Sequence, residues 1–129
     1  MGVSPRVLNV RSTKQTDMDM KTLKPVIDNT PIYKAVPQFG KLREEVLLGD
    51  VWQQPELAFR DRILVTCGVL AATGKLEELR HWMRRGVENG ITLDELRGLV
   101  VQVMFYAGWP AGLCAGRAAL ELFEAEGTE

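Results

Sequence analysis

The stretch from Phe59 to Thr73 is the feature that most constrains how this chain of 129 residues can fold. Beyond its first turn, apolar side chains fall around nearly the whole circumference of a helix instead of along one stripe. A helix that is apolar on all sides is buried on all sides. Because so short a chain cannot easily bury such a helix alone, we expect part of it to meet another subunit of a homo-oligomer.

The remaining chain also favours helices, and no segment alternates apolar and polar residues as a half-buried strand does. Thr92 and Glu95 form a capping box that opens one helix, and Pro110 suits the first turn of another. Pro31 and Pro37 are expected to bracket a turn. We therefore expect an all-α fold of about five to six helices. The expected helices cover residues 17–29, 39–48, 59–73, 75–89, 92–108 and 111–124.

Residues 1–16 are polar, mildly basic and without a periodic apolar pattern. Such a segment has too little apolar surface to bury. We therefore expect a flexible N-terminal arm over residues 1–16 and a single all-α domain over residues 17–129.

Composition excludes two classes of partner. Sixteen Lys and Arg residues stand against seventeen Asp and Glu residues, which gives a formal net charge of −1, so no nucleic-acid-binding surface is expected. No apolar run approaches the ~18 residues of a membrane span, and the first residues lack the apolar core of a signal peptide. We expect a cytoplasmic protein that binds neither nucleic acid nor a membrane.

Three polar side chains stand in otherwise apolar surroundings. Arg62 lies on the apolar helix, where it can clamp a substrate carboxylate with two hydrogen bonds or form a salt bridge between subunits. Gln102 and Tyr106 lie one turn apart on one helix face. If they are buried they need hydrogen-bond partners, which either a bound ligand or an internal network supplies.

His81 is the only histidine in the chain. At 100° per residue it lies roughly 170° from the centre of the apolar stripe on its own helix, and charged residues flank it there. We therefore expect His81 on a solvated face, unless a contact with another subunit turns it into a pocket. The apolar stripe consists of Leu76, Leu79, Met83 and Val87.

Cys67 and Cys114 lie on different predicted helices and form no Cys-x-x-Cys pair. We expect both to be buried, unreactive thiols. One histidine and two separated cysteines give no recognisable ligand spacing, so no metal site is expected.

Four short motifs follow one another in a characteristic order: Gly-Asp-Val-Trp at 49–52, Gly-Lys-Leu-Glu-Glu-Leu at 74–79, Asn-Gly-Ile-Thr at 89–92 and Tyr-Ala-Gly-Trp-Pro-Ala at 106–111. With these motifs, residues 48–123 resemble the carboxymuconolactone decarboxylase family. The resemblance implies an all-α subunit that assembles as a trimer, or as a hexamer built from dimers, and a reaction that needs neither metal nor organic cofactor. That reaction leaves a carbanion delocalised into a lactone carbonyl. It needs a group that holds the carboxylate, a donor to the carbonyl oxygen and an acid that protonates carbon.

The sequence departs from the family pattern at three positions. Trp82 and Gln102 stand where the decarboxylases usually carry histidine, and Asp50 stands where they usually carry glutamate. The resemblance therefore implies changed chemistry. We expect a cofactor-independent lyase or isomerase that acts on a small or aromatic carboxylic acid, lactone or enol.

Asp50 is the expected acid or base, because the indole of Trp52 would partly desolvate its carboxylate. Gln102 and Tyr106 can aim two donors at one oxygen. The expected order of importance for turnover is Asp50, then Gln102, then His81. The candidate site residues are Asp50, Gln102, Tyr106 and His81 for catalysis, and Trp52, Arg62, Trp82 and Trp109 for substrate binding.

Two other classes of function stay open. One is a thiol-dependent alkyl hydroperoxide reductase that uses Cys67 or Cys114 singly. The other is a non-catalytic oligomer that binds a ligand.

Overall fold

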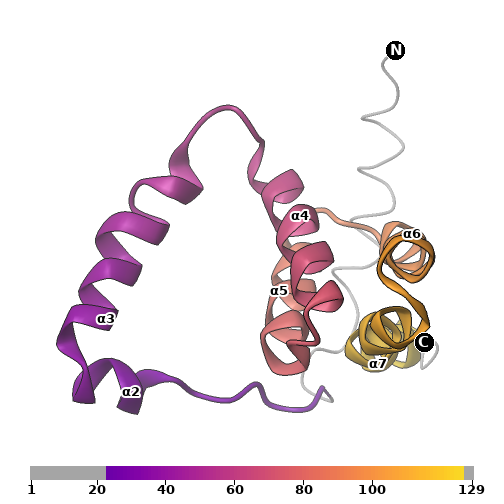
Figure 1. Ribbon diagram of the computed structural model, residues 1–129, viewed down its shortest axis with the longest axis horizontal. Coiled ribbons are helices and arrows are strands. Elements are labelled where there is room, and N and C mark those ends of the chain that lie inside the picture. The colour runs from indigo at the N-terminus through magenta and orange to yellow at the C-terminus, as the bar shows by residue number, and fades with distance from the viewer. Residues whose placement is uncertain (1–22, 127–129) are drawn as a thin grey trace.

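The computed structural model describes residues 23–126, and every regular element in this part of the chain is helical. The all-α prediction is therefore confirmed. Four helices form a bundle: α4 (Phe59–Ala72), α5 (Leu76–Glu88), α6 (Leu93–Ala107) and α7 (Trp109–Glu126). Figure 1 shows that residues 30–53, here called the outer segment, stand away from this bundle. The outer segment consists of α2 (Thr30–Ala35), α3 (Pro37–Leu42), the π-helix η2 (Arg43–Leu48) and the short 3₁₀ helix η3 (Val51–Gln53).

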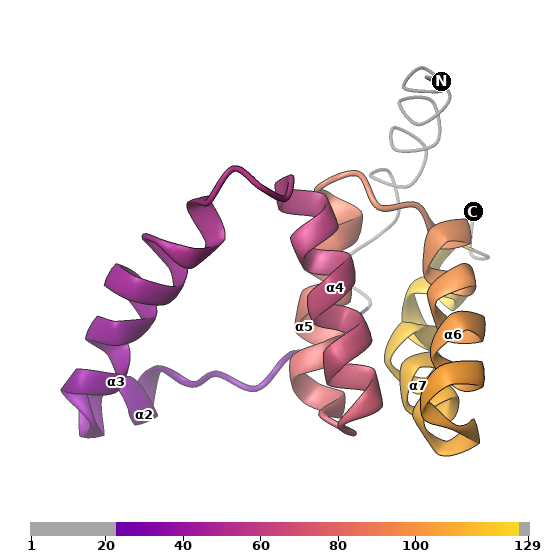
Figure 2. The same cartoon turned by 45° about the horizontal axis from the view of Figure 1, so that its top comes forward.

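One apolar core unites the four bundle helices, and Figure 2 shows them standing side by side as two pairs, α4 with α5 and α6 with α7. The pair α6 and α7 is joined at Gly108, whose φ of 103° favours glycine. Among residues 23–126, none of the helices is both long and apolar enough to cross a membrane. The largest fully buried side chains include Ile63, Leu79, Met83, Leu96 and Leu122.

Helix boundaries in the bundle follow the local signals in the sequence. The capping box is formed, because the amide of Glu95 donates to Thr92 Oγ1 at 3.0 Å and the amide of Thr92 donates to Glu95 Oε1 at 2.9 Å. Gly74, with a φ of 73°, follows the end of α4. The predicted helices 59–73, 75–89, 92–108 and 111–124 are all present to within two residues at their ends.

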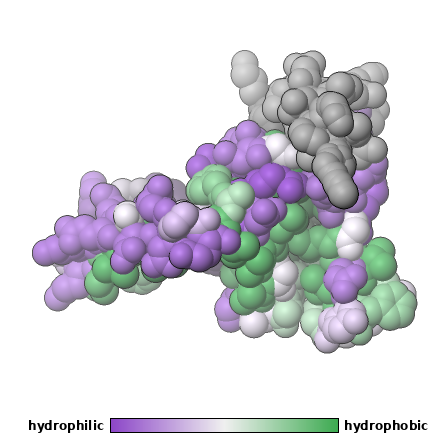
Figure 3. All heavy atoms as spheres, turned by 90° about the horizontal axis from the view of Figure 1, so that it is seen from above, coloured by the Kyte–Doolittle hydropathy of each residue, from purple (hydrophilic) through white to green (hydrophobic). Residues whose placement is uncertain are grey.

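Helix α4 is not buried on all sides within one protomer. Ile63, Cys67 and Ala71 are fully buried, whereas Val65 and Val69 on another face are 55% and 56% exposed. Figure 3 shows hydrophobic side chains gathered on the bundle, while the visible face of the outer segment is mostly hydrophilic. The exposed valines leave an apolar face that fits the expected subunit contact, which stays a prediction.

The N-terminal predictions were less accurate. Residues 17–22 lie outside the described residues, and residues 23–29 are not helical, so the described part of the expected helix 17–29 is wrong. The predicted turn is also wrong, because Pro31 and Pro37 each sit in the first turn of a helix. A proline there fits well, since its missing amide hydrogen has no partner in a first turn anyway. The expected arm over residues 1–16 lies outside the described residues.

Gly49 ends the outer helices as predicted. A Cβ atom at this position would lie 2.7 Å from the carbonyl oxygen of Glu44 and 2.8 Å from that of Glu45. No side chain fits so close to two backbone oxygens. The glycine therefore lets the chain leave the π-helix and turn back toward the bundle.

Two contacts tie the outer segment to the bundle, one near each end. At its C-terminal end, the buried indole of Trp52 stacks on Trp82 of α5, with ring centroids 4.6 Å apart and planes 6° apart. Phe59 packs against the same indole, with a centroid distance of 5.4 Å. Aromatic pairs of this kind contribute about 0.5–1.5 kcal/mol beyond their buried area.

The chain ahead of the outer segment is held by Glu121 of α7. Its carboxylate accepts hydrogen bonds from the amide of Lys24 at 3.0 Å, from Arg84 at 2.7 Å and from Arg80 at 3.3 Å. Both arginines also donate to the carbonyl oxygen of Lys24. The bonds to Arg84 and the Lys24 amide hold the pKa of Glu121 below its usual value, against the effect of desolvation. We call this group the Glu121 clasp.

Close packing of α6 on α7 predicts opposite effects for two glycines of the same helix. Gly112→Ala places a Cβ 2.7 Å from Met104 Cβ and 3.2 Å from Met104 Cα, so we expect a loss of about 1–3 kcal/mol in the free energy of unfolding. Gly116→Ala meets no described atom within 4 Å and is expected to gain up to about 1 kcal/mol from helix propensity. Urea denaturation at one fixed protein concentration measures both. Equal effects of the two substitutions would show that α6 and α7 are not in close contact at Gly112.

Candidate functional site

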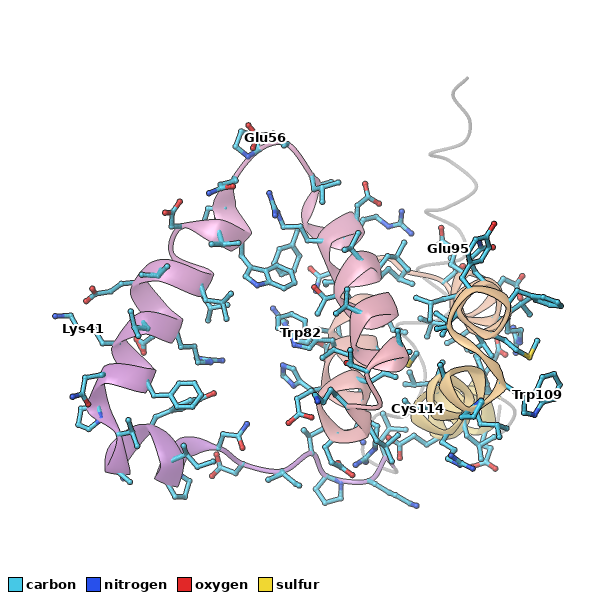
Figure 4. The ribbon with its side chains drawn as sticks, in the orientation of Figure 1. Lys41, Glu56, Trp82, Glu95, Trp109 and Cys114 are labelled. Atoms are coloured by element: carbon cyan, nitrogen blue, oxygen red, sulfur yellow. The ribbon has the colours of Figure 1, made fainter. Side chains whose placement is uncertain are left out.

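A hollow of about 1040 Å³ lies between the outer segment and α5. Three parts of the chain line it: residues 26–30, the side of the outer segment that faces the bundle, and four side chains of α5. Figure 4 shows Trp82 at the α5 side of this space. The α5 side chains are Glu77, Glu78, His81 and Trp82, and the charged or phenolic groups opposite them are Arg43, Glu44 and Tyr33.

His81 is partly buried and lines this hollow. Its ring meets Trp82 edge-on, with centroids 5.1 Å apart. Desolvation lowers the pKa of the imidazole, the charges of Arg85 and Arg43 lower it further, and Glu88 opposes them. The imidazole is therefore held in its neutral form at neutral pH.

The expectation that His81 lies on a solvated face is thus wrong. The helix arithmetic itself holds, since His81 does point away from the apolar stripe of its helix that packs into the bundle core. The outer segment covers that opposite side, however, and the cover comes from the same chain. The sequence-based alternatives allowed only another subunit to do this.

Arg43 is the cation on the facing wall. It begins η2, it is partly buried, and its guanidinium lies 5.3 Å from the centre of the Tyr33 ring. Its charge reaches His81 across the hollow, where it disfavours the imidazolium. A guanidinium in such a place can hold a carboxylate or an enolate oxygen with two parallel hydrogen bonds. Sequence reasoning missed Arg43, because nothing in the outer segment marked the side that faces α5.

Of the three tryptophans expected to line the site, only Trp82 lines the hollow. Trp82 lines it, but Trp52 lies behind Trp82 as a buried stacking partner. Trp52 therefore supports the site instead of lining it. A flat apolar surface stands where the family resemblance suggested an imidazole.

Asp50 is near the hollow but does not line it. Its carboxylate is exposed and accepts a hydrogen bond from Gln54 Nε2 at 3.3 Å. The expected desolvation by Trp52 is wrong, because that indole turns inward to stack on α5 while Asp50 stays on the surface of the connector.

Arg62 lies on the other side of this connector. Its Nη2 donates to the carbonyl oxygen of Gln54 at 2.7 Å. In the described chain its recorded partner is therefore a backbone carbonyl, and no ion pair of Arg62 is found among residues 23–126. The side chain fixes the connector between the outer segment and α4.

Gln102, Tyr106 and Trp109 lie away from the hollow. Gln102 is exposed and lines a smaller apolar groove of about 420 Å³ between α4 and α6. Tyr106 is 84% exposed and Trp109 is 65% exposed, and Figure 4 shows Trp109 on the side of the bundle far from Trp82. The expectation that one pocket joins these residues with Trp52 and Trp82 is wrong for a single protomer. Their catalytic or binding roles stay untested.

Both thiols are buried, as predicted. Burial raises the pKa of the Cys67 thiol to about 12, which keeps it protonated. Within residues 23–126, no three His, Cys, Asp or Glu side chains are arranged to hold a metal ion.

The model of one known protein family matches most of the chain. The model described as "Carboxymuconolactone decarboxylase family" matches residues 37–122. The chain belongs to the carboxymuconolactone decarboxylase family. The match begins at the first residue of α3, so it includes Arg43, His81 and both aromatic side chains of the stack.

Two curated proteins are similar to this member of the carboxymuconolactone decarboxylase family. The 4-carboxymuconolactone decarboxylase of Acinetobacter baylyi is 43% identical over 76 residues, which are 59% of this chain and 57% of that protein. The nitrosuccinic acid decarboxylase of Metarhizium robertsii is 35% identical over 63 residues, which are 49% of this chain and 44% of that protein. The chain thus spans about half the length of the curated relatives it matches.

The surroundings of His81 predict the direction of its titration. We expect its pKa below 6.5, because desolvation and three nearby guanidiniums, of Arg85, Arg43 and Arg84, disfavour the imidazolium. Arg43→Gln removes one of these charges and should raise the pKa. Arg97→Gln is the matched control, because Arg97 pairs with Asp94 and Glu126 and does not act on His81. NMR titration of the single imidazole measures the three proteins. A pKa unchanged by Arg43→Gln would show that the two groups do not share the hollow.

The same shift predicts how folding stability depends on pH. A lowered pKa means that the unfolded chain binds the proton more readily than the folded protein does. The contribution of His81 to the stability of the folded protein is present above the pKa of the unfolded chain, which is near 6.5. It is lost as the pH falls through the pKa of His81 in the folded protein. We therefore expect the free energy of unfolding to decrease over this range. The decrease should be smaller in His81→Gln, as measured by urea denaturation at several pH values.

Proposed function

We propose that this chain is a decarboxylase that acts, without a cofactor, on a small carboxylic acid bound in the hollow between the outer segment and α5. The observation that carries the proposal is that Arg43 and a neutral His81 line one hollow and interact electrostatically. Both similar curated proteins have names that describe decarboxylases. The family membership supports a lyase, and Arg43 and His81 are candidates for two of the groups that such a reaction needs, the donor to the developing oxyanion and the acid.

Decarboxylation breaks the bond between the carboxylate carbon and its neighbour. Carbon dioxide leaves, and the electron pair passes into an adjacent carbonyl or equivalent acceptor. The guanidinium of Arg43 can stabilise the oxygen on which the negative charge develops. A proton must then reach the carbon atom. His81, which is neutral at rest, would take this proton from water and then donate it to the carbon as the imidazolium.

The residues that line the hollow also indicate which class of substrate it can bind. Trp82 presents an aromatic surface, and the side of the hollow opposite α5 is rich in apolar side chains. A flat acid, lactone or enol with one charged end fits a space with one cation and an aromatic wall. The carboxylates of Asp28, Glu44, Glu77 and Glu78 line the same space, and they disfavour a substrate that is anionic along its whole length.

A thiol-dependent hydroperoxide reductase is not supported by the thiols. The thiolate is the nucleophile in such enzymes, whereas Cys67 is buried with its pKa raised to about 12. Cys114 is buried as well, and neither thiol lines the hollow.

A turnover assay tests the proposal. Carbon dioxide release is measured with 4-carboxymuconolactone, nitrosuccinic acid and a set of β-keto and aromatic acids. For the acid that turns over, His81→Gln should lower kcat by about a hundredfold or more, the usual contribution of a positioned acid or base. Arg43→Gln should lower kcat/KM by about tenfold to a hundredfold, the loss of one charge-assisted hydrogen bond. Both variants should keep the circular dichroism of the parent.

Two controls separate this site from the arrangement expected from the sequence. Gln102→Leu changes the smaller groove on α6, and Asp50→Asn changes an exposed carboxylate on the connector. We expect both to keep turnover within about threefold of the parent, since neither side chain lines the hollow. Loss of turnover in Asp50→Asn with His81→Gln nearly silent would contradict the proposal. Binding of the acid with no release of carbon dioxide would favour the non-catalytic alternative.

A further inference from the structure

Helices α2 and α3 meet at a small contact inside the outer segment. Between Thr30 and Leu48 most residues are exposed, and the partly buried ones are Tyr33, Gly40, Arg43 and Leu48. A Cβ atom at Gly40 would lie 3.2 Å from the Cβ of Tyr33. Glycine is unfavourable inside a helix, but here it lets α2 approach α3 closely. The side chain of Tyr33 therefore lies directly against α3, the helix after which Arg43 follows.

The ring of Tyr33 is the contact that holds the guanidinium of Arg43. The guanidinium carbon lies over this ring, 5.3 Å from its centre, which is within the range of cation–π attraction. Among residues 23–126, the structure shows no ion pair and no side-chain hydrogen bond of Arg43. The ring is itself fixed, because Phe39 meets it edge-on with centroids 5.4 Å apart. An arginine side chain without such a contact has many rotamers and would point into solvent.

The place of Arg43 matters because of the other charges around the hollow. Within the described residues, Arg43 is the one cation that lines this space. The other charges that act on His81 come from Arg84, Arg85 and Glu88 of the same helix. These three keep their distance to the imidazole whatever the outer segment does, whereas the distance of Arg43 depends on what holds its side chain. The remaining charged groups that line the hollow are Asp28, Glu44, Glu77 and Glu78.

We propose that Tyr33 is a positioning residue of the candidate site: its ring holds the guanidinium of Arg43 at the hollow, and through Arg43 it acts on His81 and on the bound acid. The part that concerns the acid rests on the proposed function, whereas the part that concerns His81 does not. The ring carries this role and the hydroxyl does not, because the guanidinium lies over the ring. Phenylalanine can therefore replace Tyr33, but an aliphatic residue cannot.

NMR titration of His81 tests the proposal without a substrate. Tyr33→Leu should raise the pKa of His81 in the same direction as Arg43→Gln and by no more, because a released guanidinium moves into solvent that screens its charge. Tyr33→Phe keeps the ring and should keep the pKa of the parent. Ile32→Ala is the matched control, since Ile32 is an exposed residue of the same helix that does not line the hollow. It should leave the pKa unchanged.

A double variant separates positioning from a loss of structure. If Tyr33 acts only through Arg43, adding Tyr33→Leu to Arg43→Gln should cause no further shift in the pKa of His81. If Tyr33→Leu instead unfolds α2 and α3, water reaches the imidazole, and the pKa rises further in the double variant. Such a further rise would overturn the proposal. A pKa left unchanged by Tyr33→Leu, or raised by Tyr33→Phe, would overturn it as well.

Turnover gives a second readout. For the acid that turns over, Tyr33→Leu should lower kcat/KM about twofold to thirtyfold, the range of one cation–π contact, and Tyr33→Phe should recover the value of the parent. In the Arg43→Gln background, Tyr33→Leu should cause no further loss. A loss in Tyr33→Phe as large as that in Tyr33→Leu would show that the hydroxyl contacts the acid itself, which contradicts a role through Arg43. If no acid turns over, the proposed function fails, and the titration alone decides whether Tyr33 positions Arg43.

Discussion

The stack of Trp52 on Trp82 is the contact on which the rest of the structure depends. It is the point where the outer segment, whose helices α2, α3 and η2 contain no buried residue, is fastened to a well-packed bundle. The Glu121 clasp fastens the chain ahead of that segment, with three donors on one carboxylate. A chain held at two points and unpacked between them encloses a space. The hollow beside His81 is therefore a consequence of where the two ties lie.

The bundle was largely predictable, because its signals are local. A capping box needs only Thr92 and Glu95, and it forms as expected. The helix predicted over residues 39–48 is also present, as α3 and η2. The helix α2 before it was not predicted, since Pro31 and Pro37 are compatible both with a turn and with the first turn of a helix. A helix is favoured over a turn when apolar residues continue at helical spacing beyond the proline. In a stretch with no buried face, that pattern carries little information.

The candidate site shows a sharper limit of sequence reasoning. A helical wheel fixes the direction of His81 relative to its own helix, but it says nothing about what lies opposite. Tyr106 shows the converse, since it was expected to act in the pocket together with Gln102 and is 84% exposed in the protomer. Arg43 had no signal at all, because its importance comes from a wall that another part of the chain supplies. The candidate site residues are defined by contacts between segments that are distant in the sequence, whereas the helix boundaries are set by local sequence signals.

The state of His81 links the hollow to the surface of the outer segment. Desolvation is the largest cause of its lowered pKa, and the charges of Arg85 and Arg43 act in the same direction. The imidazole is therefore less basic than a free imidazole, and its conjugate acid is a stronger proton donor. In the proposed reaction, the position of the outer segment would thus affect proton transfer, because Arg43 of that segment acts on the imidazole of α5.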